Sequence, residues 1–157
     1  MPNAAARLFV TVAGAALILA PGLAFATAQR TFVASIGNDG NPCSIVAPCR
    51  TFMTAVDKTN AGGEVIVLDS AGYGPVFIGQ SVSIVAPPSV YAGISVFSGH
   101  GITVSGAGIK VALSGLKVIG LGGDIGINFT QGTRLAVSDC EISSMDSSGR
   151  ADSGQPG

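Results

Sequence analysis

The chain has 157 residues, of which 11% are charged, with eight Lys or Arg and nine Asp or Glu side chains. Because it has no basic run, it lacks the electrostatic attraction that supplies most nucleic-acid affinity, and we expect no nucleic-acid partner. A hydrophobic fraction of 47% together with 23 glycines favours short strands and tight turns over a helical bundle, and the length predicts one folded domain.

Residues 1–28 have the three parts of a secretory signal peptide. Arg7 gives a basic start, residues 8–20 are apolar, and small residues follow the breaker at 21–22. The A-x-A pattern predicts cleavage after Ala26 or Ala28. An uncleaved membrane anchor is the alternative, but the apolar run at 8–20 falls short of the roughly 20 residues that span a bilayer. We therefore expect a secreted or periplasmic protein with no membrane span after cleavage.

Three cysteines remain in the exported chain, in a compartment where disulfides can persist. Cys43 and Cys49 enclose a short loop with a proline before each cysteine, which predicts a disulfide; a pair of free thiols is the alternative. Two cysteines are too few for a zinc site, and His100 is far along the chain, so we expect neither a metal nor a cofactor. Cys140 is left over, and we expect it in the core rather than as a reactive nucleophile.

The predicted domain, residues 29–142, opens with a strand at 30–37. A dense turn signal follows, in which Asp39 is expected to hydrogen-bond the backbone of its own loop. Thr51 is a suitable N-cap, and the i, i+3, i+4 spacing of the apolar residues after it predicts a short helix that ends at 61–63. The apolar residues of this helix are Phe52, Ala55 and Val56.

Beyond Gly63 the pattern changes to short β-branched runs separated by Gly-rich corners. No helical period interrupts these runs, and their length and composition predict strands. The predicted strands are 64–68, 76–78, 81–85, 93–97, 101–104, 109–113, 116–119, 125–129, 135–137 and 140–142.

Apolar positions of the later strands recur at a nearly constant step. Stacked coils require such a step, because equivalent side chains must lie above one another. The earliest strands do not keep it, so their register stays open. The pairs at the 24-residue step are Leu113 and Val137, Leu116 and Cys140, Val118 and Ile142, Ala92 and Leu116, and Ile94 and Val118; the pairs at a 25-residue step are Ile102 and Ile127, and Val104 and Phe129.

A set of short segments in the first half of the chain reads FVASIGNDGNPC at 32–43, APCRTF at 47–52, AV at 55–56, AGGEV at 61–65, GY at 72–73 and SVSI at 81–84. This set is similar to the opening segment of secreted right-handed parallel β-helix proteins of the pectin-lyase-like superfamily, and the resemblance covers about residues 30–142. It implies an all-β fold, a right-handed parallel β-helix of about three coils, in which the helix near Phe52 is a short N-terminal cap on the first coil. It implies little about activity, because the superfamily includes lyases, hydrolases and binding proteins.

Gly99-His100-Gly101 resembles the Gly-His-Gly element of pectin hydrolases on this fold. The acidic elements that accompany it in that family are missing from the preceding coils, and His100 itself supplies no carboxylate. An inverting hydrolase needs two carboxylates about 6.5–9.5 Å apart. We therefore expect a surface histidine in a glycine corner, and His100 is a catalytic candidate only if that expectation fails.

Asp139 and Glu141 flank Cys140 and form the best acidic group in the chain. Lyases on this fold gather several carboxylates around Ca²⁺, whose six to eight oxygen ligands require more acids than this. The 24-residue step stacks Lys117 on Glu141, which predicts a salt bridge between coils rather than a metal site. Asp139 and Glu141 are the other two catalytic candidates. Four aromatic residues are candidates for a sugar-binding platform, with two of the four expected to face the core: Tyr73, Phe77, Tyr91 and Phe97.

Residues 143–157 are polar and rich in Gly and Ser, which predicts a disordered tail. No C-terminal cap is recognisable after Ile142, so the last coil is expected to expose unpaired backbone groups through which copies of the chain could self-associate. A shortened member of the family is one explanation of this pattern.

A β-helix scaffold without a catalytic set predicts an exported, non-catalytic protein that interacts with polysaccharide or another component of the cell envelope. Two alternatives stay open. One is a weak polysaccharide lyase or hydrolase that uses His100, Asp139 and Glu141. The other is a truncated fragment without independent function.

Overall fold

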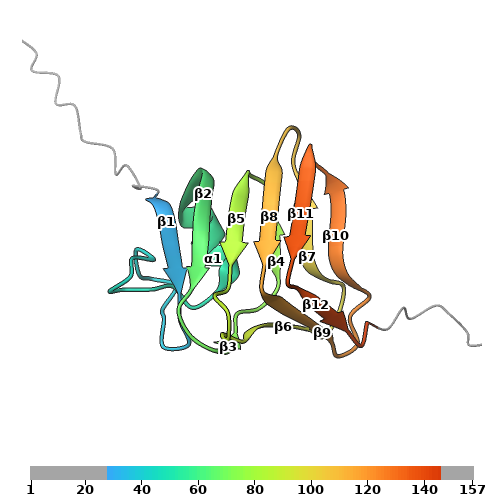
Figure 1. Ribbon diagram of the computed structural model, residues 1–157, viewed down its shortest axis with the longest axis horizontal. Helices are drawn as coiled ribbons and strands as arrows, with labels where there is room; N and C mark the ends of the chain where they lie inside the picture. The colour runs from blue at the N-terminus through green and yellow to red at the C-terminus, as the bar shows by residue number, and fades with distance from the viewer. Residues whose placement is uncertain (1–27, 146–157) are drawn as a thin grey trace, which may run out of the picture.

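The computed structural model describes residues 28–145. The predicted signal peptide lies outside these residues except for Ala28, and so does the predicted disordered tail from residue 146 onward. The first residues assigned to that tail are ordered, because the last strand runs through Ser143 and Met145 packs partly against the core. The described chain is mostly β-structure, and every pair of neighbouring strands is parallel (Figure 1).

The strands form three sheets, and one helix follows the first strand. The five-stranded sheet has the order β1-β2-β5-β8-β11, the four-stranded sheet the order β12-β9-β6-β3, and the three-stranded sheet the order β10-β7-β4. The elements are β1 Ala28–Val33, α1 Phe52–Lys58, β2 Thr59–Val67, β3 Ala71–Gly72, β4 Val76–Ile78, β5 Val82–Val85, β6 Ala92–Val96, β7 His100–Ser105, β8 Lys110–Ser114, β9 Leu116–Gly120, β10 Ile125–Gln131, β11 Arg134–Ser138 and β12 Glu141–Ser143.

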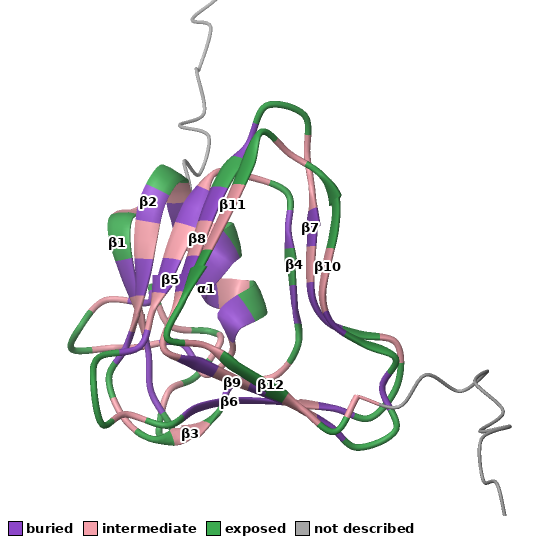
Figure 2. Ribbon diagram, turned by 45° about the vertical axis from the view of Figure 1, so that its right-hand side comes forward, coloured by how far each residue is buried: buried purple, intermediate pink, exposed green. Residues whose placement is uncertain are grey.

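After α1 the chain visits the three sheets in a fixed order. One circuit is β2-β3-β4, the next is β5-β6-β7, the third is β8-β9-β10, and β11-β12 begin a fourth. In Figure 2 the three sheets form the sides of a triangular outline, with α1 between the five-stranded sheet and β4. This arrangement is compatible with a parallel β-helix, in which parallel strands are joined by crossovers around a common core.

The core consists of columns of apolar side chains that stack from circuit to circuit. On the five-stranded sheet Val65 pairs with Ile84, Ile84 with Leu113, and Leu113 with Val137. The first three are fully buried or nearly so, because burial alternates along each strand and these positions face the interior. The 24-residue and 25-residue pairings predicted for residues inside the later strands are confirmed on all three sheets, whereas Cys140, the predicted partner of Leu116, precedes the paired part of β12.

The register of the early strands, which sequence alone leaves open, does not follow a constant step. The number of residues between paired positions varies because the corners differ in length. The step along the chain from Val65 to Ile84 is much shorter than the step from Ile84 to Leu113, although both pairs lie on neighbouring strands. The second step contains the long corner with Pro87 and Pro88, which delays the start of β6.

The helix also ends earlier than predicted. Its last residue is Lys58, because the segment from Thr59 onward joins β2 and pairs with β1. Gly62 and Gly63, which the sequence places at the end of the helix, therefore lie within β2.

The corner from the five-stranded to the four-stranded sheet has a left-handed residue in two successive circuits. Between β8 and β9, Gly115 has a φ of 74°, and a Cβ there would lie 2.5 Å from the carbonyl oxygen of Ala86. One circuit later the same corner is formed by Asp139, with a φ of 53°. Asp is among the residues that tolerate the left-handed region, so this position has a structural role in turning the chain.

Candidate functional site

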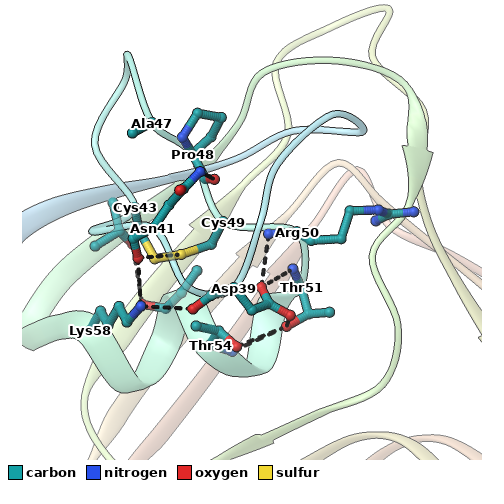
Figure 3. Close-up of a disulfide and its surroundings, with 12 residues drawn as sticks. Asp39, Asn41, Cys43, Ala47, Pro48, Cys49, Arg50, Thr51, Thr54 and Lys58 are labelled. Carbon is teal, nitrogen blue, oxygen red and sulfur yellow. Dashed lines mark hydrogen bonds between the residues drawn. A yellow bond between two sulfur atoms is a disulfide. The ribbon is translucent and has the colours of Figure 1, made fainter.

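The disulfide-closed loop holds the edge of β1. Cys43 and Cys49 are joined by a disulfide, as predicted, and both are fully buried (Figure 3). The backbone of the loop pairs with β1: Phe32 N donates to Cys43 O at 2.8 Å, Cys49 N to Phe32 O at 2.9 Å, and Ala34 N to Cys49 O at 3.0 Å. The loop therefore satisfies backbone groups that an edge strand would otherwise expose.

Asp39 connects this loop to the start of α1. Its carboxylate accepts hydrogen bonds from Arg50 N at 2.8 Å, Thr51 N at 3.0 Å and the Thr51 hydroxyl at 3.0 Å. The expectation that Asp39 bonds its own loop is thus wrong, since these partners lie 11 and 12 residues further on. Inside the loop that role belongs to Asn38, whose side chain accepts from Gly40 N. Lys58 adds a second link, because its ammonium group donates to Asp39 O at 2.9 Å.

The stability of the protein should depend on the ionisation of Asp39. Burial alone would raise the pKa of Asp39, but hydrogen bonds from Arg50 and Thr51 outweigh it and hold the pKa below its usual 3.8. A depressed pKa in the folded state means that this stabilisation is complete above pH 3.8 and is lost as the pH falls through the folded value. We expect Asp39→Ala to lower the free energy of unfolding by about 1–2 kcal/mol at neutral pH, as loss of a helix cap does. Denaturant titrations at several pH values measure this, and the wild type and the variant should converge at low pH; a constant difference down to low pH would contradict it.

A second polar network surrounds Tyr73. The Tyr73 ring is fully buried against Phe52, with ring centroids 5.1 Å apart, and its hydroxyl donates to Asp69. Asp69 also accepts from Ser35 N at 2.7 Å and from the Ser35 hydroxyl. Burial and the neighbouring carboxylate raise the pKa of Tyr73, while the hydrogen bonds from Ser35 and Tyr73 lower the pKa of Asp69. Tyr73 therefore belongs to the core and not to a surface platform.

The role of Asp69 is not visible in the sequence, where it is only a polar residue between two strands. The nearest signal is its spacing from Tyr73, four residues further on, whose hydroxyl reaches back to it. Nothing in that spacing indicates Ser35, which comes from the segment after β1.

The structure separates His100 from the other two predicted catalytic candidates, Asp139 and Glu141. His100 is an exposed residue at the start of β7, in the three-stranded sheet. Glu141 begins β12 in the four-stranded sheet and forms an ion pair with Lys117, its partner on β9. The hydrogen bond and the charge of Lys117 lower the pKa of Glu141. The salt bridge predicted from the 24-residue step is thus present, and Asp139 occupies the corner beside it.

Cys140 has a free thiol and is half-buried, with partial packing against the core. The sequence predicts it inside the core, as the equivalent of the fully buried Leu116 one circuit earlier. The difference arises because β12 is the last strand of its sheet. Side chains there have a neighbour on one side only.

Two exposed aromatic residues, Tyr91 and Phe97, flank β6 in the four-stranded sheet. Inward residues of β6 are buried, so Gly93 and Ser95 face outward. Gly93 pairs with Gly72 on β3 and with Lys117 on β9. The Tyr91 ring lies over Gly93, since a Cβ at Gly93 would be 2.5 Å from that ring. Gly72 and Gly93 add no side chains of their own to this face, and the Tyr91 ring covers Gly93.

Two shallow depressions border this face. One of about 400 Å³ is formed by Gly72, Gly74, Pro75, Ser95, Phe97 and Ser98. The Phe97 side chain is 71% exposed at its rim. The other, of about 510 Å³, lies at the corner before β6 and β9 and includes Pro87, Pro88, Lys117 and Asp139. Tyr91, Phe97 and the acidic candidates Asp139 and Glu141 therefore lie along the four-stranded sheet, whereas the exposed Phe77 and His100 belong to the three-stranded sheet.

Among residues 28–145, no three His, Cys, Asp or Glu side chains are grouped so that they could hold a metal ion. Within the same range, no helix has the length and apolar character needed to cross a bilayer. No protein-family model, no curated protein and no solved structure matches the chain.

Proposed function

We propose that this chain is an exported, non-catalytic, right-handed parallel β-helix of the pectin-lyase-like type, and that the outer face of its four-stranded sheet binds a polysaccharide of the cell envelope. The observation that carries the proposal is the pair of exposed rings, Tyr91 over Gly93 and Phe97 beside Gly72, on a face to which these glycines add no side chains. Apolar faces of sugar rings stack on aromatic rings, whose large flat surfaces bind with little loss of conformational freedom.

The fold supports this use of the sheet. Parallel strands joined through crossovers are right-handed in nearly all cases, which gives the hand of the helix. Helix α1 packs against β1, β2 and β4 and acts as the N-terminal cap of the stack, as terminal elements of repeat folds must shield the core. The disulfide between Cys43 and Cys49 fits an oxidising compartment outside the cytosol, and hence export through the segment 1–28.

The acidic candidates are better explained by structure than by catalysis. Glycoside hydrolysis needs two carboxyl groups about 5–9.5 Å apart that flank one bond, one of them with a raised pKa. The pKa of Glu141 is lowered instead, and its carboxylate accepts a hydrogen bond from Lys117. Asp139 holds a left-handed corner that Gly115 holds one circuit earlier. Binding without cleavage follows from these roles.

Calorimetric titration with soluble oligosaccharides of galacturonan, xylan, β-glucan and peptidoglycan tests the proposal. We expect one class to bind, and we expect Tyr91→Ala and Phe97→Ala each to weaken that binding by about tenfold, as truncation of a central aromatic contact does. Phe77→Ala is the matched control, because Phe77 is similarly exposed but lies on β4, in the three-stranded sheet. It should leave the affinity unchanged.

Two results would overturn this proposal. At about 1 mM oligosaccharide even weak sites fill. Absence of binding for all four classes at that concentration would exclude polysaccharide as the ligand. Release of unsaturated products or new reducing ends, abolished by His100→Ala or Glu141→Gln, would identify a lyase or hydrolase.

A further inference from the structure

The depression beside Phe97 on the four-stranded sheet contains no ionisable side chain. Every residue that forms it is uncharged: Gly72, Gly74, Pro75, Ser95, Phe97 and Ser98. A carboxylate of a ligand would lose part of its water here without gaining a charged partner, which is unfavourable. The lining therefore favours a ligand that carries no charge at this position.

The polar side chains of this depression are hydroxyls. Ser95 faces outward from β6, and Ser98 follows Phe97 in the corner after that strand. Within residues 28–145, neither hydroxyl forms a hydrogen bond to the protein. A serine hydroxyl both donates and accepts hydrogen bonds, so the two serines match the hydroxyl groups of a sugar whose ring lies against Phe97.

The cation nearest to the other ring is already paired. Lys117 is the neighbour of Gly93 on β9, and the Tyr91 ring lies over Gly93. The Lys117 ammonium group forms an ion pair with Glu141 on β12. Asp139 adds a second carboxylate, because it lines the same depression as Lys117. A ligand stacked on Tyr91 therefore meets no uncompensated positive charge at Lys117.

Arg50 is a second cation near this face, and it too is engaged by the protein. Its guanidinium group donates to Gly72 O at 2.7 Å and lies over the Tyr73 ring, 5.6 Å from the centroid. Hydrogen bonds from Ser35 and Tyr73 hold the pKa of Asp69 below its usual value. The nearby charge of Arg50 lowers that pKa further, so Asp69 is ionised and offsets Arg50.

The other Lys and Arg side chains between residues 28 and 145 lie elsewhere. Arg30, Lys110 and Arg134 belong to strands of the five-stranded sheet. Lys58 of α1 donates to backbone carbonyls of the disulfide-closed loop and its approach. Attraction of a polyanion depends on a surface lined by charge of the opposite sign, and the described strands of the four-stranded sheet do not provide one.

We propose that the polysaccharide bound by the four-stranded sheet is neutral, and that polymers with a carboxylate on each sugar are excluded. The inference rests on the proposed function, because it concerns the ligand of the same face. Sugar rings stack on Tyr91 and Phe97. Their hydroxyls bond to Ser95 and Ser98, and the ion pair at the edge of the sheet stays closed.

Calorimetric titration with matched pairs of oligosaccharides tests this inference. One pair is a β-gluco-oligosaccharide and the same compound oxidised to a carboxylate at C6. The other pair is a galacturonan oligosaccharide and its fully methyl-esterified, neutral form. In a pair that binds, we expect the charged member to bind at least about tenfold more weakly, because its carboxylates lose water without gaining a partner.

The possible failures are distinguishable. Tighter binding of the charged member of either pair, or binding of the carboxylate-bearing peptidoglycan oligosaccharides alone, would overturn the neutral ligand and leave polysaccharide binding in place. Absence of binding for both pairs and for the xylan and peptidoglycan oligosaccharides would overturn the proposed function, and the inference with it.

A variant that opens the ion pair gives a second readout. Glu141→Gln leaves Lys117 without its partner, so the ratio of the dissociation constants of the charged and neutral members should fall about two- to fivefold, as expected for one exposed ion pair. Glu64→Gln is the matched control, since it releases Arg30 in the same way on the five-stranded sheet, and should leave the ratio unchanged. An unchanged ratio in Glu141→Gln, or an equal fall in both variants, would overturn the role of this ion pair in excluding charged ligands.

Discussion

Replacing Phe52 with alanine is expected to lower the free energy of unfolding by about 3–5 kcal/mol, the range measured for buried aromatic residues. Phe52 is fully buried on the inner side of α1, and its ring packs on Tyr73. The substitution leaves a cavity between the helix and the sheets that surround it. Denaturant unfolding followed by circular dichroism, at fixed protein concentration, gives the difference.

The neighbouring Met53 is the matched control for this prediction. It lies on the same helix but is exposed, and alanine is a good helix former. Met53→Ala should therefore change the free energy of unfolding by less than about 0.5 kcal/mol, as surface substitutions usually do. Equal losses for Phe52→Ala and Met53→Ala would mean that α1 is not packed as described.

Removal of the disulfide is expected to cost about 2–4 kcal/mol. Replacing both Cys43 and Cys49 with alanine removes a closed loop, for which chain entropy alone gives roughly 2 kcal/mol. It also releases the backbone pairing that the loop makes with Phe32 and Ala34 on the edge of β1. Thermal unfolding of the double variant should show a melting temperature lower by about 5–15 °C for a domain of this size.

Reduction of the wild-type protein provides an independent check on the disulfide. It should lower the melting temperature by a similar amount, and the double variant should not respond to reductant. Cys140→Ala should keep the response to reductant, because Cys140 is not bonded to another cysteine. A melting temperature unaffected by loss of both Cys43 and Cys49 would show that the loop does not support β1.

Local sequence patterns predict the strands well and the early register poorly. Alternating burial along β8 follows from its alternating apolar residues, and the repeat from Leu113 to Val137 reveals its pairing with β11. The unequal steps from Val65 to Ile84 and from Ile84 to Leu113 hide the same geometry in the earlier circuits. Corner length is set by loops such as 86–91, whose size no periodic pattern constrains.

At the candidate site, too, the sequence predicts some contacts and not others. The ion pair between Lys117 and Glu141 follows from the 24-residue step because both residues face outward on neighbouring strands. The same step also relates Asp139 to Gly115 and would have identified a corner residue. The contacts of Asp39 and Asp69 join segments separated by 11 to 34 residues, and only the folded chain brings these together.

The last described circuit illustrates a further limit of prediction from a repeat pattern. Val137 and Ile142 have the inward orientation that the repeat predicts, yet each is nearly half exposed. Burial depends on the next layer as well as on orientation, and a repeat pattern does not show whether a next layer is present.

The central claim is that successive circuits stack in the stated parallel register, and engineered disulfides test it most directly. In a Cys140→Ser background, Ser114→Cys with Ser138→Cys places two thiols on paired positions of β8 and β11. Neighbouring strands are about 4.8 Å apart, within the range that a disulfide spans. Ser114→Cys with Ala136→Cys is the control, since Ala136 pairs with Ala112 and an offset of two residues separates the Cα atoms by about 8 Å. Mass spectrometry after mild oxidation should find the intrachain bridge in the first variant and not in the second. The reverse pattern, or no bridge in either, would contradict the stacked register on which the proposed binding face depends.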